Sequence, residues 1–336
     1  MGFRLGILEQ SVIEQGESAE LTLQKTVELA QLAEQWGYDR FWVSEHHHSV
    51  HLAGSNPEIL ATFLAAHTKT IRIGSGGVLL NHYSPYKVAE AFHVLASLVP
   101  GRIDVGVGKG PGGFPLSTQA LRLDQKEQPM PFEEKFGALH QFLTQQDITT
   151  GPYAGLLATP LPQVKPELSL LGTSAESAKL AAQHDAHFVY GTMFNANETA
   201  MDEAIQAFHA HNKKGRLIVA VSVIVAPTKQ QAEQQVMNRQ IVKVHLANGQ
   251  SVTVLDEASG HQFAAQSGQA YELEVQTRDI ITGTAADVWT TLTNLAETYG
   301  IDEFLIQTPV QHHAAKQQSL QLLGAYKQQK TAMPTV

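Results

Sequence analysis

The stretch "RFWVSEHHHSVHLAGSNPEILATFLAAHTKTIRIGSGGVLL", residues 40–80, decides the fold. It opens with a short apolar run that reads as a buried strand and closes with a second apolar run at 71–80. Between them, Asn56 is a favoured N-cap and Pro57 fits the first helical position, so a helix is predicted over 56–68. A strand, a helix and a second strand in this order indicate a βαβ unit, whose two strands lie parallel.

The same alternation recurs along the rest of the chain. Strands are predicted at 3–11, 40–45, 71–80, 102–110, 167–174, 186–193, 216–228 and 302–309. Helices are predicted at 21–39, 56–68, 84–101, 131–144, 175–185, 198–211, 229–239, 287–300 and 314–329. Eight βα units in a chain of 336 residues favour a closed (β/α)8 TIM barrel over an open doubly wound sheet. The expected fold class is therefore α/β, with residues 1–330 forming a single barrel domain.

Residues 241–278 interrupt this repeat. In "VKVHLANGQSVTV", residues 242–254, apolar residues alternate on both sides of Asn248-Gly249, which is a strong signal for a two-residue turn. We therefore expect an inserted β-hairpin at about 241–255, between the seventh strand and the helix that carries Trp289. Such insertions often cover an active site as a lid, and a surface ornament is the alternative. A Gly- and Pro-rich stretch at 148–165 reads as a long loop.

Composition excludes several classes of function. The chain has no cysteine, which rules out disulfides, thiolate nucleophiles and Cys-based metal sites. Its net charge of −9, with scattered Lys and Arg, provides no basic surface for nucleic acid or anionic membranes. No apolar run approaches the ~18 residues that span a bilayer. The start, "MGFRLGILEQ", lacks the features of a signal peptide, so a cytoplasmic protein is expected.

Glycines gather at the ends of the third and fourth predicted strands, in "GSGG" at 74–77 and "GVGKG" at 106–110. In a TIM barrel the active site lies at the C-terminal ends of the strands. Glycines there give up side-chain packing and let a large, flat group approach the backbone. Because two neighbouring strands share this feature, a cofactor slot is predicted at Ser75, Gly76 and Gly77. The alternative is a bulge that only helps to close the barrel.

A phosphate site is predicted beside this slot. Thr173, Ser174 and Ser177 open the helix after the fifth strand, and hydroxyl and N–H groups at a helix N-terminus bind phosphate. Ordinary N-capping is the alternative. Lys109 ends the neighbouring strand and would supply the counter-charge. "GKGPGG", from Gly108, also matches G-x-G-x-x-G, but no acidic ribose partner follows it.

The second strand ends in "EHHH", residues 45–48. Alternation along a strand sends Glu45 and His47 to one side, and His46 and His48 to the other. Imidazole titrates near neutrality, so a histidine at the barrel mouth suits general acid–base chemistry. A metal site is less favoured, because H-E-x-x-H is absent and no other strand end is rich in carboxylates. A polar turn without chemistry is the third reading.

These pieces, in this order, resemble the bacterial luciferase-like flavin-dependent monooxygenases. The resemblance is carried by "GYDRFWVSEHH" from 37, "NP" at 56, "KTIRIGSGGVLL" from 69, "HYSPYKVAEAFHVLASLVPGRIDVGVGKG" from 82 and "GIDEFLI" from 300. It runs over most of the chain and weakens at about 112–165 and 228–280. No single motif decides it; the ordered set does.

The resemblance implies a monooxygenase acting on paired donors. Such an enzyme takes reduced FMN from a separate flavin reductase, forms a flavin C4a-hydroperoxide with O₂, and oxidises an aldehyde or another small organic substrate. It implies catalytic roles for His46, in acid–base steps, and for Glu45, which would brace His46 or the backbone beside it. It also implies a non-proline cis peptide at Gly76-Gly77 beneath the flavin.

The resemblance further implies a phosphate site at Lys109, Thr173, Ser174 and Ser177, and no metal. It implies a homodimer paired through the second and third helices, with Phe63 and Phe92 as possible contacts, and a place in the core is an equally good explanation for both. Gly108 stands where luciferase has a cysteine, and Lys109 where it has an arginine, so light emission does not follow. A deazaflavin-dependent hydride-transfer enzyme and a non-catalytic flavin-binding protein are the alternatives.

Overall fold

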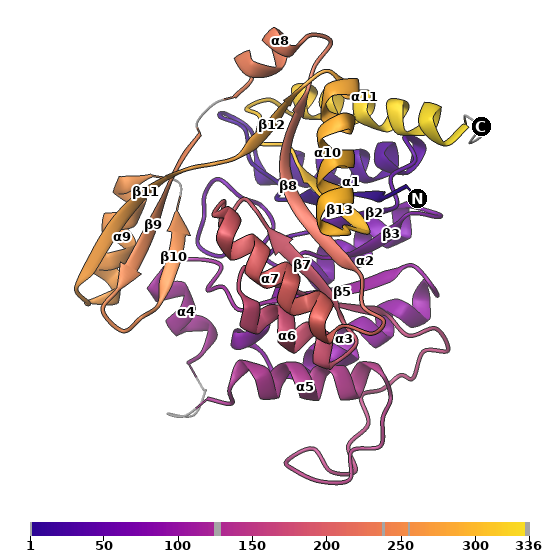
Figure 1. The fold of residues 1–336 in the computed structure, drawn as a ribbon. Helices are drawn as coiled ribbons and strands as arrows, with labels where there is room; N and C mark the ends of the chain where they lie inside the picture. The colour runs from indigo at the N-terminus through magenta and orange to yellow at the C-terminus, as the bar shows by residue number, and fades with distance from the viewer. Residues whose placement is uncertain (1, 124–128, 237–238, 255, 333–336) are drawn as a thin grey trace.

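The computed structural model describes residues 2–123, 129–236, 239–254 and 256–332. Within them, eight parallel strands close into a barrel, because β1 pairs with β2 and β13 and the ring closes between β7 and β8 (Figure 1). These strands are β1 (Arg4–Glu9), β2 (Arg40–Val43), β3 (Arg72–Ser75), β5 (Ile103–Gly108), β6 (Glu167–Gly172), β7 (His187–Gly191), β8 (Leu217–Val225) and β13 (Glu303–Gln307). The predicted TIM barrel is confirmed.

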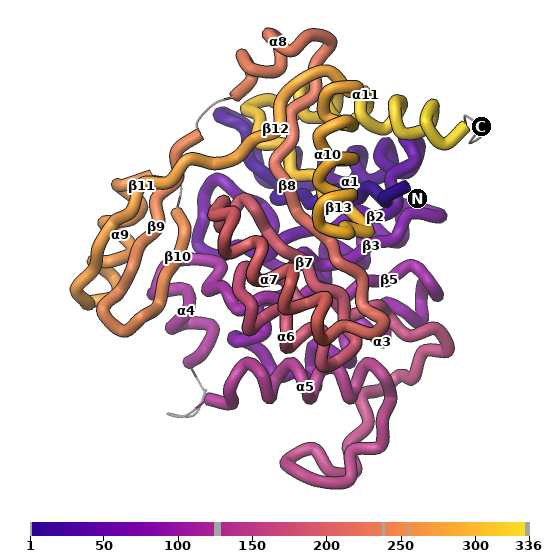
Figure 2. Tube along the Cα trace, in the orientation of Figure 1, coloured from indigo at the N-terminus to yellow at the C-terminus, as the bar shows by residue number. Residues whose placement is uncertain are grey.

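The helices lie outside the barrel and, apart from α4, which was not predicted, they follow the strands in the predicted order (Figure 2). They are α1 (Ala19–Gln35), α2 (Pro57–His67), α3 (Pro85–Leu98), α4 (Pro115–Leu121), α5 (Phe132–Leu143), α6 (Ala175–Gln183), α7 (Glu198–His211), α8 (Lys229–Gln234), α10 (Ala285–Tyr299) and α11 (His313–Ala332). The predicted start of α2 is confirmed, because the Asn56 side chain accepts a hydrogen bond from Ile59 N at 3.0 Å. Helix α8 ends before the predicted 239, and residues 237 and 238 lie outside the described residues.

Two predicted segments between the barrel elements differ in detail. The third predicted strand, 71–80, is divided at Gly76-Gly77 into β3, the short β4 (Val78–Leu79), and a 3₁₀ turn at Leu80–His82. The Gly- and Pro-rich loop is present, since no helix or strand lies between α5 and β6.

The insertion is larger than the predicted hairpin. Strands β9 (Gln240–Leu246) and β10 (Ser251–Val254) form that hairpin, with Val242 opposite Val254 and Gly249 at a φ of +84°. Helix α9 (Glu257–Ser267) and strand β11 (Tyr271–Thr277) follow, and β11 pairs with the free edge of β9. The unit lies beside α4 in Figure 1, and the Phe114 ring, just before α4, lies 6.2 Å from that of Phe263. The chain then rejoins the barrel through β12 (Ile280–Gly283), parallel to β8.

An ionic layer fills the N-terminal end of the barrel. Arg40 is fully buried, and its guanidinium donates to Asp104 Oδ2 at 2.9 Å and to Glu303 Oε1 at 2.5 Å. Trp42 Nε1 and Arg72 Nε also donate to Asp104, each at 2.9 Å. Above this layer, an apolar cluster that contains Leu8, Trp42, Val189, Ile218 and Leu305 occupies the interior. This packing leaves the C-terminal strand ends as the place for chemistry.

Candidate functional site at the barrel mouth

His46 lies on the barrel side of the chain after β2. Trp42 packs in the barrel interior, and alternation places Ser44 and His46 on the same side. The contact between Ser44 Oγ and His46 Nδ1, at 3.2 Å, agrees with this placement. The Ser44 hydroxyl donates its hydrogen to Glu9 O at 3.4 Å, so Ser44 Oγ is left to accept a hydrogen bond from His46. This favours the tautomer in which His46 Nδ1 carries the proton and Nε2 has the lone pair.

The electrostatics of His46 favour a neutral ring. Burial lowers the pKa of His46 to about 4, and the nearby His47 lowers it further, while Glu45 opposes the shift. The imidazole is therefore neutral at pH 7, and it is a weaker base than an ordinary histidine.

Glu45 lies on the opposite side of the chain. Its Oε1 accepts hydrogen bonds from His47 Nε2 and from the Tyr83 hydroxyl, each at 2.6 Å, and its Oε2 accepts from Leu79 N at 2.9 Å. Burial and the bond to Glu45 raise the pKa of Tyr83, which keeps its hydroxyl protonated. Glu45 therefore binds the side chains of His47 and Tyr83 and the backbone of Leu79 in β4.

The glycines and Ser75 join β3 to β5. Ser75 Oγ donates to Gly106 O at 2.8 Å and accepts from Gly106 N at 3.1 Å. A Cβ atom at Gly106 would lie 2.2 Å from Ser75 O, and one at Gly77 would lie 2.8 Å from Gly106 O. The Gly76-Gly77 peptide is cis, as the resemblance implied. These glycines therefore permit close approach of two strands, and the Ser75 hydroxyl is used between them.

Gly108 differs from its neighbours. Asp104 contacts Arg40 inside the barrel, and alternation along β5 places Gly106 and Gly108 on that same interior side. A Cβ atom at Gly108 would meet no heavy atom within 4 Å. Open space therefore lies over β5 at the barrel mouth, which is where a flat cofactor needs room.

The last two glycines of the "GKGPGG" stretch, Gly112 and Gly113, have a packing role. A Cβ atom at Gly112 would lie 2.0 Å from the Leu79 side chain, and one at Gly113 would lie 2.5 Å from His47 O. In addition, His47 N donates to Gly112 O at 2.7 Å. This loop therefore packs against the segment that carries Glu45 and His47.

The predicted phosphate residues end two adjacent strands, since β5 pairs with β6. Ser174 caps α6 by accepting from Ser177 N at 3.3 Å, and Ser177 is buried. Alternation along β6 places Thr173 on the interior side, in line with Leu171 of the interior cluster. Lys109 has an acidic partner that the sequence did not indicate: its Nζ lies 2.7 Å from Glu133 Oε1 on α5.

The described residues contain neither a cluster of metal ligands nor a helix that could span a membrane. Among residues 2–123, 129–236, 239–254 and 256–332, no three or more His, Asp or Glu side chains are grouped so as to hold a metal ion. In the same part of the chain, every helix is too short or too polar to cross a bilayer.

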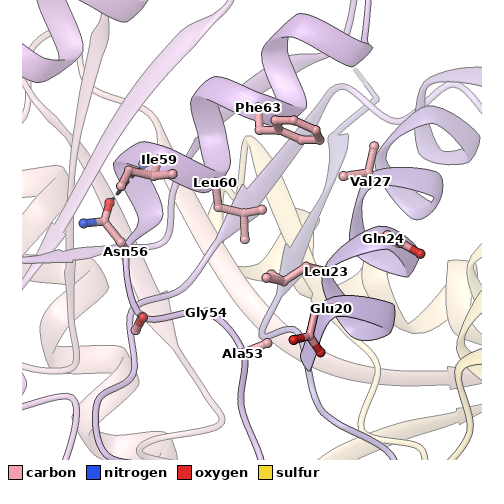
Figure 3. A pocket seen from close by; sticks show the side chains of 11 residues that line it. Glu20, Leu23, Gln24, Val27, Ala53, Gly54, Asn56, Ile59, Leu60 and Phe63 are labelled. Atoms are coloured by element: carbon pink, nitrogen blue, oxygen red, sulfur yellow. Dashed lines mark hydrogen bonds between the residues drawn. The ribbon is translucent and has the colours of Figure 1, made fainter. Parts of the chain in front are cut away.

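A cavity of about 440 Å³ lies outside the barrel, between α1 and α2 (Figure 3). Its lining is mainly apolar, with Leu23, Val27, Leu60 and Phe63, and polar groups of Glu20, Gln24 and Asn56 at its edge. Phe63 is 53% exposed, whereas Phe92 is 1% exposed and packs in the core. Of the two explanations for Phe92, the core one therefore holds, and Phe92 is not a surface contact.

Comparison with known proteins agrees with this architecture. The family model described as luciferase-like monooxygenase matches residues 3–327. An N-acetyl-S-alkylcysteine monooxygenase of Bacillus subtilis (strain 168) is 46% identical over 324 residues, covering 96% of this chain and 97% of the relative. A luciferase-like monooxygenase of Escherichia coli (strain K12) is 29% identical, covering 96% of each chain.

Solved structures show the same fold. The crystal structure of apo-MsnO8 superposes with a TM-score of 0.77 at 28% identity, covering 97% of this chain and 99% of that one. The oxygenating constituent of 3,6-diketocamphane monooxygenase from Pseudomonas putida, a complex with FMN, superposes with a TM-score of 0.70 at 19% identity, covering 96% and 97%. The second likeness shows the fold alone. The resemblance predicted from the sequence is confirmed.

Proposed function

The chain belongs to the luciferase-like monooxygenase family, and from this premise we propose that it is an FMN-dependent monooxygenase of the paired-donor class. It would use reduced FMN and O₂ to transfer one oxygen atom to a small organic substrate. One observation carries the proposal: a neutral His46 on the barrel side of β2 accompanies open space over Gly108 at the same mouth. A proton acceptor and room for a flat ring are what flavin chemistry requires.

The chain's own residues fit this cofactor. The isoalloxazine ring would lie over the backbone of Gly76, Gly77 and Gly108, and the phosphate would lie at Lys109 and the start of α6, with Thr173, Ser174 and Ser177. Bound reduced FMN supplies the electrons that activate O₂. His46 Nε2 would hold or accept a proton at the mouth, and Glu45 would position the Leu79 backbone behind it. We propose a separate reductase as the source of reduced FMN, in the cytoplasm.

For the substrate we propose a thioether that carries an N-acylated cysteine. Support comes from the relative named for N-acetyl-S-alkylcysteine, which aligns over 96% of this chain at 46% identity. An aldehyde is the competing substrate class, from the family resemblance. The two classes are distinguished by offering both to the enzyme with reduced FMN.

A substitution at Gly108 tests the cofactor site. In Gly108→Leu the side chain would enter the open space, so we expect FMN affinity to fall about tenfold or more, while the unfolding midpoint stays near that of the wild type. FMN binding is measured by fluorescence titration without oxygen. Gly106→Ala is the contrasting variant, because its Cβ would collide with Ser75 O and lower the unfolding midpoint.

The titration also separates the alternatives. Unchanged FMN affinity in Gly108→Leu would contradict the proposed position of the ring. A wild-type protein that binds no FMN but oxidises a reduced deazaflavin without consuming oxygen would favour hydride transfer. Tight FMN binding without an oxygenated product from either substrate class would favour a non-catalytic flavin-binding protein.

We also propose a homodimer formed through α2 and α3. Large apolar side chains are exposed on these helices, with Ile59 at 70%, Phe63 at 53%, Val94 at 47% and Leu98 at 66%. The cavity beside Phe63 offers a recess for a side chain of the second copy. A surface of this kind is costly to leave in water and marks an interface.

Light scattering checks the dimer. We expect a dimer for the wild type and a shift to monomer for Phe63→Glu, because the interface would then bury an unpaired carboxylate. Leu161→Glu is the matched control, since Leu161 is 49% exposed in the 148–165 loop. A monomeric wild type, or equal effects of both variants, would refute the proposed interface.

A further inference from the structure

Glu133, in the first turn of α5, has no role in the site as described so far. Its Oε1 lies 2.7 Å from Lys109 Nζ, and the Lys109 ammonium lies 4.9 Å from the centroid of the Phe132 ring. The ion pair is open to solvent, because the Lys109 and Glu133 side chains are 39% and 56% exposed. Two neighbouring residues of α5 therefore hold the cation that the proposed phosphate site needs.

Other charges surround the same strand ends. Glu176 lies in the first turn of α6, and its pKa is lowered by its own backbone N–H, by the Ser174 hydroxyl and by the nearby Lys179 and Lys109 ammonium groups. The Lys109 ammonium therefore interacts electrostatically with a glutamate in the first turn of α5 and with one in the first turn of α6. The two lysines are matched by two glutamates, so this end of the site offers a phosphate group no excess of positive charge.

We propose that Glu133 competes with the flavin phosphate for the Lys109 ammonium and thereby sets the preference of the site for FMN over riboflavin. This inference rests on the proposed function. A phosphate monoester carries a charge of about −1.5 to −2 at pH 7, so a carboxylate beside the same ammonium repels it. The lysine ammonium is a compact point charge, whereas the arginine guanidinium offers donors in a planar fork. Two anions therefore compete for the lysine ammonium.

The consequence is a cofactor that exchanges readily. Glu133 keeps Lys109 in place over Phe132 when no phosphate is bound, and it weakens the hold on phosphate when FMN arrives. Since the reduced flavin is proposed to come from another protein at each turnover, moderate affinity favours its release after oxidation. Glu133 is thus a positioning residue that acts on the cofactor through Lys109.

The test compares FMN with riboflavin, which lacks the phosphate. Binding of each oxidised flavin is followed by fluorescence for the wild type, Glu133→Gln, Glu133→Asp and Glu134→Gln. We expect Glu133→Gln to bind FMN about two- to fivefold more tightly, the range for an exposed charge pair, with the gain shrinking at high salt. Riboflavin affinity should stay unchanged, and Glu133→Asp, which keeps the charge, should stay close to the wild type.

Glu134→Gln is the matched control, because Glu134 is exposed in the same helical turn and the substitution changes net charge equally. Its FMN affinity should equal that of the wild type. Unchanged or weaker FMN binding in Glu133→Gln, an equal shift for riboflavin, or an equal shift in Glu134→Gln would each overturn the inference. If the wild type binds no FMN, the proposed function fails as well; if it binds FMN and Glu133→Gln behaves identically, this inference alone fails.

Discussion

Replacing His46 by alanine should lower the turnover of the enzyme by about 10²- to 10⁴-fold, the usual effect of removing a positioned acid–base group. The physical reason is its place: the ring lies on the barrel side, is held at Nδ1 by Ser44, and is neutral because burial lowers its pKa to about 4. FMN affinity should change little, since the proposed phosphate and ring contacts come from other strands. Formation of the oxygenated product in the presence of a flavin reductase, FMN and catalase measures turnover, and anaerobic titration measures binding.

His48→Ala is the matched control for this variant. His48 is exposed, with a φ of +56°, two residues further along the same segment. Its removal should leave turnover and FMN affinity near wild-type values. Full activity in His46→Ala, or an equal loss in His48→Ala, would refute the role assigned to His46.

Replacing Arg40 by methionine should destabilise the barrel by about 3–5 kcal/mol, the range for removing one partner of a buried ion pair. Arg40, Asp104 and Glu303 are all fully buried, so the variant leaves Glu303 without the guanidinium that it now contacts at 2.5 Å. Asp104 retains its bonds from Trp42 and Arg72, so Glu303 should account for most of the loss. The midpoint of urea unfolding, followed by circular dichroism, measures the change.

The double variant Arg40→Met, Glu303→Leu separates charge from packing. If an uncompensated carboxylate causes the loss, replacing it by an apolar side chain should recover at least half of the lost stability. A double variant no more stable than Arg40→Met would assign the loss to packing around Gly6, where Arg40 lies close. An unchanged midpoint in Arg40→Met would contradict the account of the ionic layer.

The barrel strands and the sides of β2 could be predicted because alternation is a local property. Alternation predicted that Glu45 and His47 lie on one side of the chain and His46 and His48 on the other. In the structure Glu45 contacts His47, whereas His46 contacts Ser44. The hairpin was predicted for a similar reason, from valines that alternate around Asn248-Gly249. That residues 1–330 form a single domain stays a prediction.

The rest depended on contacts that a local pattern does not carry. Strand β11 was missed although Tyr271, Leu273 and Val275 alternate with polar residues, a pattern that could have indicated this largely exposed strand. Helix α9 was missed because Gly260 and few apolar residues weaken its helical pattern. The partners of Glu45 and Lys109 were missed since Tyr83 and Glu133 lie 38 and 24 residues away along the chain. Such pairs arise from loop conformations after the strands, which sequence spacing alone does not fix.

The most direct test of the central claim is the origin of the oxygen atom in the product. The enzyme is supplied with FMN, NADH, a flavin reductase and catalase under ¹⁸O₂, with an N-acetyl-S-alkylcysteine and a long-chain aldehyde offered separately. Catalase removes the peroxide that free reduced flavin makes, so any oxygenation then requires the enzyme. The account predicts one ¹⁸O atom in the product of the thioether, strongly reduced in Gly108→Leu and His46→Ala. Products without ¹⁸O, or no enzyme-dependent product from either substrate, would contradict it.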